Sequence, residues 1–253
     1  MRSRDRRSFL ARAGAVGGAA WLAGCDRLAT KSGFAGWLGS SDGLTERVQR
    51  SLTARDALAH EYDESAIASS FRANGSINPQ APEYLTLRAN DFRDWRLAIG
   101  GMVRAPFSLS LDELRALPAR TQITRHDCVE GWSAIGKWTG PLLGSILERA
   151  GVESAARFVV FRCMDNLGGV GMYYESIALE DAYHPQTILA YNLNDKALPV
   201  ANGAPLRVRP ERMLGYKMAK YLSGIEVVDS LAGIEGGKGG YWEDRGYQWF
   251  GGI

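Results

Sequence analysis

Residues 125–138 read RHDCVEGWSAIGKW and place a cysteine among several side chains that can carry chemistry. His126 and Asp127 precede Cys128, and Glu130 follows it by two positions. The thiolate form of cysteine is both a nucleophile and a ligand for soft metals. Cys128 therefore has four open roles: a small buried hydrophobe, half of a disulfide, a nucleophile or a metal ligand.

The other cysteines and the histidines narrow these roles. Beyond Cys25, the chain holds only Cys128 and Cys163. An oxidising compartment permits a disulfide between them, although a domain of this length does not need that cross-link. A zinc site has little support, because no CxxC or HxxxH pattern occurs. A Cys-His hydrolase remains open, since His126 shares a strand face with Cys128 and His184 is a further histidine. The last reading is a thiolate ligand to a soft, oxidisable metal.

The N-terminus MRSRDRRSFLARAGAVGGAAWLAGC has the layout of an export signal, with arginines followed by a short apolar run at 13–23. That run is too short to span a bilayer, which needs about 20 apolar residues. RRSFL at 6–10 resembles a twin-arginine signal, and LAGC resembles a lipobox. We expect residues 1–24 to be a signal, Cys25 to be lipidated and the protein to be periplasmic. A leader without an export role and a plain cleavage site are the alternatives.

Charge excludes one broad class of partner. The leader holds five arginines and one aspartate, so the chain's net charge of +2 becomes −2 for the remaining 229 residues. This balance gives no basic surplus for nucleic acid, and we expect no nucleic-acid partner. No apolar run reaches the length of a membrane span.

The elements that must position Cys128 alternate between strands and short helices. No GxGxxG or GxxxxGK[ST] motif and no regular βαβ rhythm occurs, so the pattern predicts an α+β fold with mixed sheets and short helices. We expect a tether and helical segment at 25–70, a catalytic domain at 71–230 and a glycine- and aromatic-rich arm at 231–253 that packs over it. Strands are expected at 94–103, 121–128, 157–162, 187–199, 204–210 and 221–229, and helices at 44–52, 110–117, 139–150 and 175–182.

Local signals support several of these elements. Ser110 with Glu113 forms a capping-box pattern at a helix start. Proline near the start and Gly151 past the end frame the helix expected from Thr139. The dipeptide Asn194-Asp195 predicts a turn inside the segment 187–199.

Two segments resemble a known family. Cys128-VEGW followed by GKWTGPLLGSIL resembles the molybdenum-cysteine segment of the sulfite oxidase superfamily. Residues 180–229, with NGAPLR and GYKMAK, resemble the cofactor-binding half of that superfamily. The resemblance implies one Mo-molybdopterin per chain, with Cys128 on the metal. It implies two-electron oxygen-atom transfer on a small sulfur or nitrogen oxo compound.

The resemblance also implies a set of cofactor-binding residues. A pterin phosphate is a dianion that needs cationic or forked donors, and glycine turns let backbone N–H groups approach it. Cys163 is equally consistent with a buried structural cysteine, Trp132 and Trp138 with core, and Glu130 with a hydrogen bond near the cysteine or proton transfer. The implied cofactor-binding residues are Arg72, Asn74, Cys128, Cys163, His184, Asn202, Arg207, Lys217, Met218 and Lys220.

The resemblance also bears on partners. The sequence carries no haem or iron–sulfur motif, so electrons should pass to a separate carrier, which the family implies to be a membrane haem protein or a cytochrome. In size and export signal the chain resembles the periplasmic methionine sulfoxide reductases of this superfamily more than it resembles the eukaryotic-type sulfite oxidases, although the pattern around the cysteine differs. A non-catalytic binding protein on the same fold is the competing class.

Overall fold

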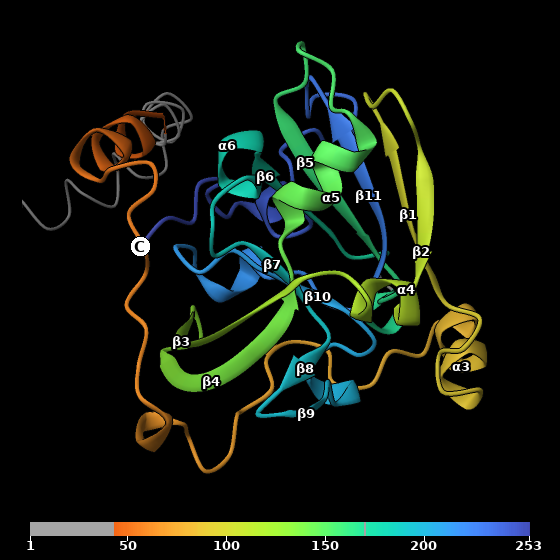
Figure 1. Cartoon of the computed structure of the whole chain (residues 1–253). Helices are drawn as coiled ribbons and strands as arrows, with labels where there is room; N and C mark the ends of the chain where they lie inside the picture. The colour runs from red at the N-terminus through yellow and green to blue at the C-terminus, as the bar shows by residue number, and fades with distance from the viewer. Residues whose placement is uncertain (1–42, 170) are drawn as a thin grey trace, which may run out of the picture. The chain divides into compact units, whose positions relative to one another are not determined.

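The computed structural model describes residues 43–169 and 171–253 (Figure 1). The expected signal and the lipid site at Cys25 therefore lie outside the described residues. The chain divides into two compact units, Met1–Ser51 and Leu52–Ile253. In the first unit, residues 43–51 are helical, as the apolar spacing predicts. The second unit holds every other described element and includes residues 231–253.

The larger sheet of the second unit has five strands in the order β2-β1-β11-β5-β6. Strands β1 and β11 run parallel, and the other neighbours are antiparallel. The predicted alternation holds in β1, where Leu97 and Ile99 are buried beside Trp95, whose indole N–H donates to the Leu222 carbonyl. The strands are β1 Arg96–Gly101, β2 Phe107–Ser110, β5 Phe158–Cys163, β6 Tyr174–Ala178 and β11 Leu222–Val228.

A second sheet has the order β3-β4-β8-β9, and its long hairpin β3–β4 carries Cys128 (Figure 1). Cys128 and Trp132 form the last pair before the hairpin turn, which needs Gly131 in the left-handed region at φ 84°. The Cys128 thiol therefore lies at the turn end of the paired strands β3 and β4. The strands are β3 Ala119–Cys128, β4 Trp132–Pro141, β8 Asn192–Leu193 and β9 Lys196–Ala197.

A two-stranded sheet pairs β7 Ile188–Ala190 with β10 Arg207–Arg209. It lies against β4, because a Cβ at Gly140 would fall 1.9 Å from the Leu189 carbonyl oxygen. Only glycine fits at this crossing, which brings β10 and its arginines beneath the hairpin.

The helices are short. They are α3 Pro82–Ala89, α4 Leu111–Arg115, α5 Leu143–Ala150 and α6 Leu179–Ala182. Single 3₁₀ turns are η1 Glu64–Ala66, η2 Leu167–Gly169, η3 Val200–Asn202, η4 Gly215–Lys217 and η5 Glu243–Arg245. None of the helices in the described ranges is long and apolar enough to cross a membrane.

The predicted α+β fold class with mixed sheets and short helices is confirmed. The capping box of Ser110 and Glu113 is present, and Gly151 ends α5 at φ 69°. The turn at Asn194-Asp195 is also confirmed, with φ of 52° and 61°.

Two helix boundaries are wrong. Thr139 and Pro141 belong to β4, and α5 begins only at Leu143. Thr139 pairs with Thr121 on β3 and with β8 on its other side, so ladder pairing overrides the local helix-start signal. Similarly, residues 175–178 form strand β6 against β5, and only Leu179–Ala182 are helical.

Candidate functional site

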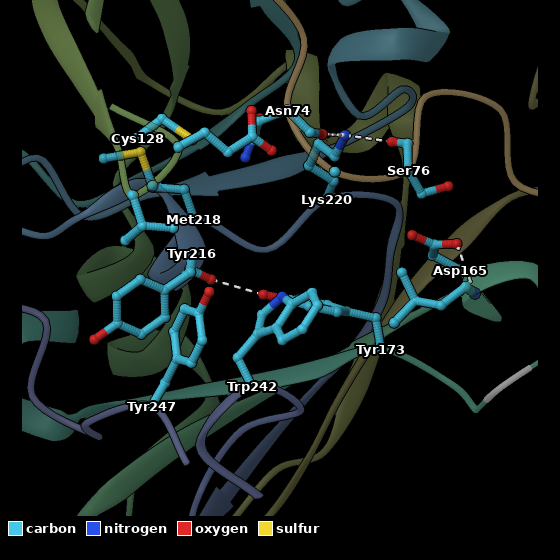
Figure 2. Close-up of a pocket in the computed structure, with 15 residues that line it drawn as sticks. Asn74, Ser76, Cys128, Asp165, Tyr173, Tyr216, Met218, Lys220, Trp242 and Tyr247 are labelled. Atoms are coloured by element: carbon cyan, nitrogen blue, oxygen red, sulfur yellow. Dashed lines mark hydrogen bonds between the residues drawn. The ribbon is translucent and has the colours of Figure 1, made fainter. Parts of the chain in front are cut away.

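Cys128 opens onto a pocket of about 200 Å³ (Figure 2). Five separate segments build it: the loop Asn74–Ser76, the hairpin tip, the segment after β5, the turn around η4 and the C-terminal residues. Four of the residues implied by the resemblance line this pocket: Asn74, Cys128, Met218 and Lys220.

The hairpin tip holds Cys128 in place through its own side chains. The Trp132 indole donates to Glu130 Oε2 at 2.9 Å, and the Arg72 guanidinium stacks over the Trp132 ring at 5.3 Å. Burial raises the pKa of the half-buried Cys128 thiol, while the positive charge of Arg72 opposes that rise. The apoprotein thus holds a protonated thiol, and a cation next to the sulfur would be needed to favour the thiolate.

The expected alternatives for the cysteines find no support in the described part of the chain. Cys128 and Cys163 are both free thiols. No group of three or more His, Cys, Asp or Glu side chains is placed to hold a metal ion there. His184 bonds the Ala57 carbonyl and accepts from the Gln186 N–H, so neither of its ring nitrogens engages Cys128.

His126 lies beneath the pocket floor and has a structural role. Its Nδ1 accepts a hydrogen bond from Arg209 Nη1 at 3.0 Å and lies 3.1 Å from Met218 Sδ. Burial, followed by the charge of Arg209, lowers the pKa of this imidazole well below its usual range, so it stays neutral. The pair positions Met218, which lines the pocket above.

Two buried cations implied by the resemblance, Lys220 and Arg207, have no carboxylate partner in the described part of the chain. Lys220 Nζ donates to the carbonyls of Asn74 at 2.6 Å, Ser76 at 2.5 Å and Ala201 at 3.2 Å. Arg207 is fully buried and donates to the carbonyls of Asn202 and Met218 at 3.0 and 3.2 Å. Among the described residues, no carboxylate oxygen comes within 4.0 Å of either cation.

The electrostatics of Lys220 and Arg207 favour an anionic ligand beside them. Burial, and next the neighbouring Arg207, lower the pKa of Lys220 to about 7. Arg207 Nε and Asn202 Nδ2 are buried, and neither has a hydrogen-bond partner among residues 43–169 and 171–253. Buried charges and donors of this kind are costly unless a ligand satisfies them. The donor set therefore fits the phosphate of a bound cofactor.

The structure places the other implied residues away from the pocket lining. Lys217 is buried behind it, where Nζ contacts Glu175 Oε1 at 2.5 Å and Glu243 Oε1 at 2.6 Å. Burial raises the pKa of Glu175, with Lys217 opposing the rise. Cys163 is buried in β5, and burial raises its thiol pKa. Trp138 lies in the core, under the guanidinium of Arg209 at 4.3 Å, as expected for a core tryptophan.

Sequence reasoning missed one wall of the pocket. It is lined by Asp165, Leu167, Tyr173, Tyr216, Trp242 and Tyr247. Tyr216 sits within the GYKMAK element, and the aromatic richness of 231–253 was the available signal for Trp242 and Tyr247. Nothing local marks Asp165 or Tyr173.

Comparison with known proteins gives a consistent family. Residues 84–232 match the family model of the oxidoreductase molybdopterin-binding domain. A candidate protein-methionine-sulfoxide reductase subunit named YedZ1, from Azospira oryzae, is 38% identical over 98% of this chain and 87% of its own length. The protein-methionine-sulfoxide reductase catalytic subunit MsrP of Xanthomonas axonopodis is 37% identical over 54% of this chain, which spans about half (46%) of MsrP. The sulfane dehydrogenase SoxCD of Paracoccus pantotrophus aligns with a TM-score of 0.49 at 20% identity, covering 55% of this chain and 39% of that one.

Proposed function

Because the chain belongs to the oxidoreductase molybdopterin-binding domain family of the sulfite oxidase superfamily, we propose that this Mo-molybdopterin oxidoreductase reduces a sulfoxide to a thioether. The names of the similar proteins from Azospira and Xanthomonas support sulfoxide as the substrate class. The reaction consumes two electrons and two protons, cleaves the S–O bond and releases the oxygen as water. The molybdenum centre, when bound, supplies this oxygen-atom transfer.

One observation carries the assignment of roles: Cys128 opens into the same pocket as Lys220, a buried ammonium whose hydrogen-bond acceptors among the described residues are all carbonyl oxygens. We assign Cys128 as the metal ligand. Lys220, Arg207 and Asn202 hold the pterin and its phosphate, since they carry unneutralised charge or unpartnered donors. Asn74 and Met218 form adjacent parts of the wall.

The remaining implied residues take supporting roles in this proposal. Arg72 positions the hairpin tip through Trp132 and adds positive charge near the thiol. Lys217 positions η4 and the C-terminal residues through its two carboxylates. Cys163 and His184 stabilise the fold through burial and backbone contacts.

The experiment that tests this function uses the holoprotein. It should contain about one molybdenum per chain and reduce methionine sulfoxide with a reduced viologen dye as electron donor. Cys128→Ala should lose turnover and retain pterin, because the proposed phosphate donors lie on other segments. Full turnover in that variant would refute the ligand assignment, and oxidation of sulfite without any sulfoxide reduction would refute the direction proposed.

Export, anchoring and electron supply form a second part of the proposal. The twin-arginine and lipobox patterns support a periplasmic protein anchored through Cys25. Two of the similar proteins are named as subunits, and this sequence has no haem or iron–sulfur motif, which supports a separate membrane haem protein or cytochrome as electron donor. Cys25→Ser should move the mature protein from the membrane to the soluble periplasmic fraction. If the mature wild-type protein instead begins at another residue and its N-terminus is unmodified, the proposed lipid anchor is refuted and the proposed export is not affected.

A further inference from the structure

We propose that Tyr173, Tyr216, Trp242 and Tyr247 form an aromatic enclosure that selects the substrate by binding the positive end of an S–O or N–O dipole. The preferred substrates are then uncharged oxides whose sulfur or nitrogen carries small alkyl groups, and anionic oxides are disfavoured. This inference rests on the proposed oxygen-atom transfer at Cys128.

The enclosure is continuous on one side of the pocket. Tyr247 contacts Tyr216 with ring centroids 5.4 Å apart, and it contacts Trp242 at the same centroid distance. Figure 2 shows these three rings together at the bottom of the view, whereas Lys220, Asn74 and Ser76 gather at the top. The pocket thus has an aromatic side and a cofactor side.

Two of the three tyrosines of the enclosure offer rings in place of hydrogen-bond donors. Tyr173 Oη donates to the Tyr216 carbonyl at 2.7 Å, and Tyr216 Oη donates to the Gln248 carbonyl at 2.8 Å. Both hydroxyls are therefore already engaged by backbone. What Tyr173 and Tyr216 can give a substrate is therefore apolar surface and the negative potential of a ring face.

The carboxylates that line the pocket favour a positive group. Asp165, only 4% exposed, lines the pocket, and Glu130 lies at its exposed rim beside Cys128. The cation that lines the pocket among the described residues, Lys220, is assigned to the cofactor anion. Aromatic faces near carboxylates attract onium-like centres, and the sulfur of a sulfoxide and its methyl groups carry such partial positive charge. An anion such as sulfite would meet repulsion here.

Two of the four rings come from residues beyond the matched family domain, which ends at 232. Glu243, next to Trp242, is paired with Lys217, which stands between the pocket residues Tyr216 and Met218. This buried ion pair holds the C-terminal residues that line the pocket against the residues of η4. The geometry therefore explains how a segment outside the shared domain can set substrate choice.

The test uses holoprotein and two isosteric probes, choline and uncharged 3,3-dimethylbutan-1-ol, as competitors of methionine sulfoxide reduction. Choline should inhibit roughly 2- to 30-fold more tightly, as cation–π attraction implies. The binding of each probe is also measured directly by calorimetry, which needs no turnover. Equal affinity for the two probes would overturn recognition of the positive end.

Variants separate the enclosure from the fold and from the cofactor. Trp242→Ala should raise KM and weaken choline binding while molybdenum and pterin contents stay at wild-type levels. Trp242→Phe should restore most of both, and Tyr183→Ala, an exposed tyrosine outside the pocket, should change neither. Tyr247 is 42% exposed, so Tyr247→Ala provides a second variant if Trp242→Ala does not fold.

The outcomes distinguish this inference from the proposed function. Unchanged KM and choline affinity in both alanine variants, with sulfoxide reduction intact, would refute the enclosure alone. Loss of cofactor from Trp242→Ala and Tyr247→Ala would also refute it, because the rings would then hold pterin. Tight choline binding without reduction of any sulfoxide or N-oxide would refute the proposed function and leave the enclosure standing.

Discussion

Replacing Lys220 by methionine should remove the cofactor and leave the fold nearly as stable as before. The substitution deletes three hydrogen bonds to the carbonyls of Asn74, Ser76 and Ala201. It also deletes a buried charge whose desolvation costs several kcal/mol. Hydrogen bonds to charged groups contribute about 1.5–3 kcal/mol each. The two effects oppose each other, so the free energy of unfolding of the apoprotein should change by less than about 2 kcal/mol.

The holoprotein should respond differently, because there the ammonium faces an anion. Losing one charge-assisted contact to a phosphate removes about 1.5–3 kcal/mol, which weakens pterin retention by roughly one to two decades. The assay is pterin and molybdenum content per chain after identical purification, together with thermal unfolding of the apoprotein. Lys196→Met, an exposed lysine on β9, is the matched control and should leave both measurements unchanged.

A pH series adds a second readout for the same lysine. Its pKa in the folded apoprotein is about 7, below the value near 10.4 expected for an unfolded chain. The unfolded state therefore binds more protons between these values, and the stability of the apoprotein should rise as pH increases from about 7 to 10. Lys220→Met should abolish that rise. Full pterin content in Lys220→Met, or an apoprotein destabilised by far more than about 2 kcal/mol, would refute the assignment of this lysine to the cofactor anion.

The remaining predictions concern three other positions. Lys217→Met leaves Glu175 buried without its cation and should cost about 3–5 kcal/mol, or roughly 6–20 °C in Tm. Lys217 opposes the rise in the pKa of Glu175 that burial causes, so without this lysine the pKa should rise further; the buried carboxyl is then protonated at pH 5 but costly to ionise at pH 8, and the Tm deficit should be smaller at pH 5 than at pH 8. Arg207→Ala should give folded protein that has lost pterin and molybdenum together. Arg207→Lys should recover only part of the cofactor content, because an ammonium lacks the planar fork of a guanidinium. Full cofactor content with lost turnover would instead place Arg207 at the substrate. Gly140→Ala should destabilise the fold by about 1–3 kcal/mol, because the added Cβ would overlap the Leu189 carbonyl oxygen. An unchanged Tm would contradict this close approach of the two strands.

Local signals were sufficient for much of the secondary structure. The capping box at Ser110 and the left-handed glycine at Gly151 act through neighbouring backbone groups, so they can be recognised without the fold. The same signals failed at Thr139. The helix-start pattern there competes with a β-ladder whose partners, β3 and β8, come from distant parts of the chain.

The candidate site was likewise predicted only in part from the sequence. The segments around Cys128 and at 180–229 were together enough to predict the family, the cofactor and the ligand cysteine, and the family and cofactor are confirmed by the comparison with known proteins. The aromatic enclosure could not be predicted, because Tyr173, Tyr216 and Trp242 come from three segments that meet only in the folded chain.

The two lysines of GYKMAK show most clearly what the sequence alone does not determine. Lys217 and Lys220 are three residues apart and equally suited by type to bind a phosphate. The sequence determined that cations stand beside a glycine turn in a cofactor-binding segment. Only the tertiary structure decided their partners: Glu175 and Glu243, 42 and 26 positions away, neutralise Lys217, whereas Lys220 donates hydrogen bonds only to carbonyl oxygens among the described residues. A buried cation is stabilised by the charges that surround it in space, and the fold alone brings those charges together.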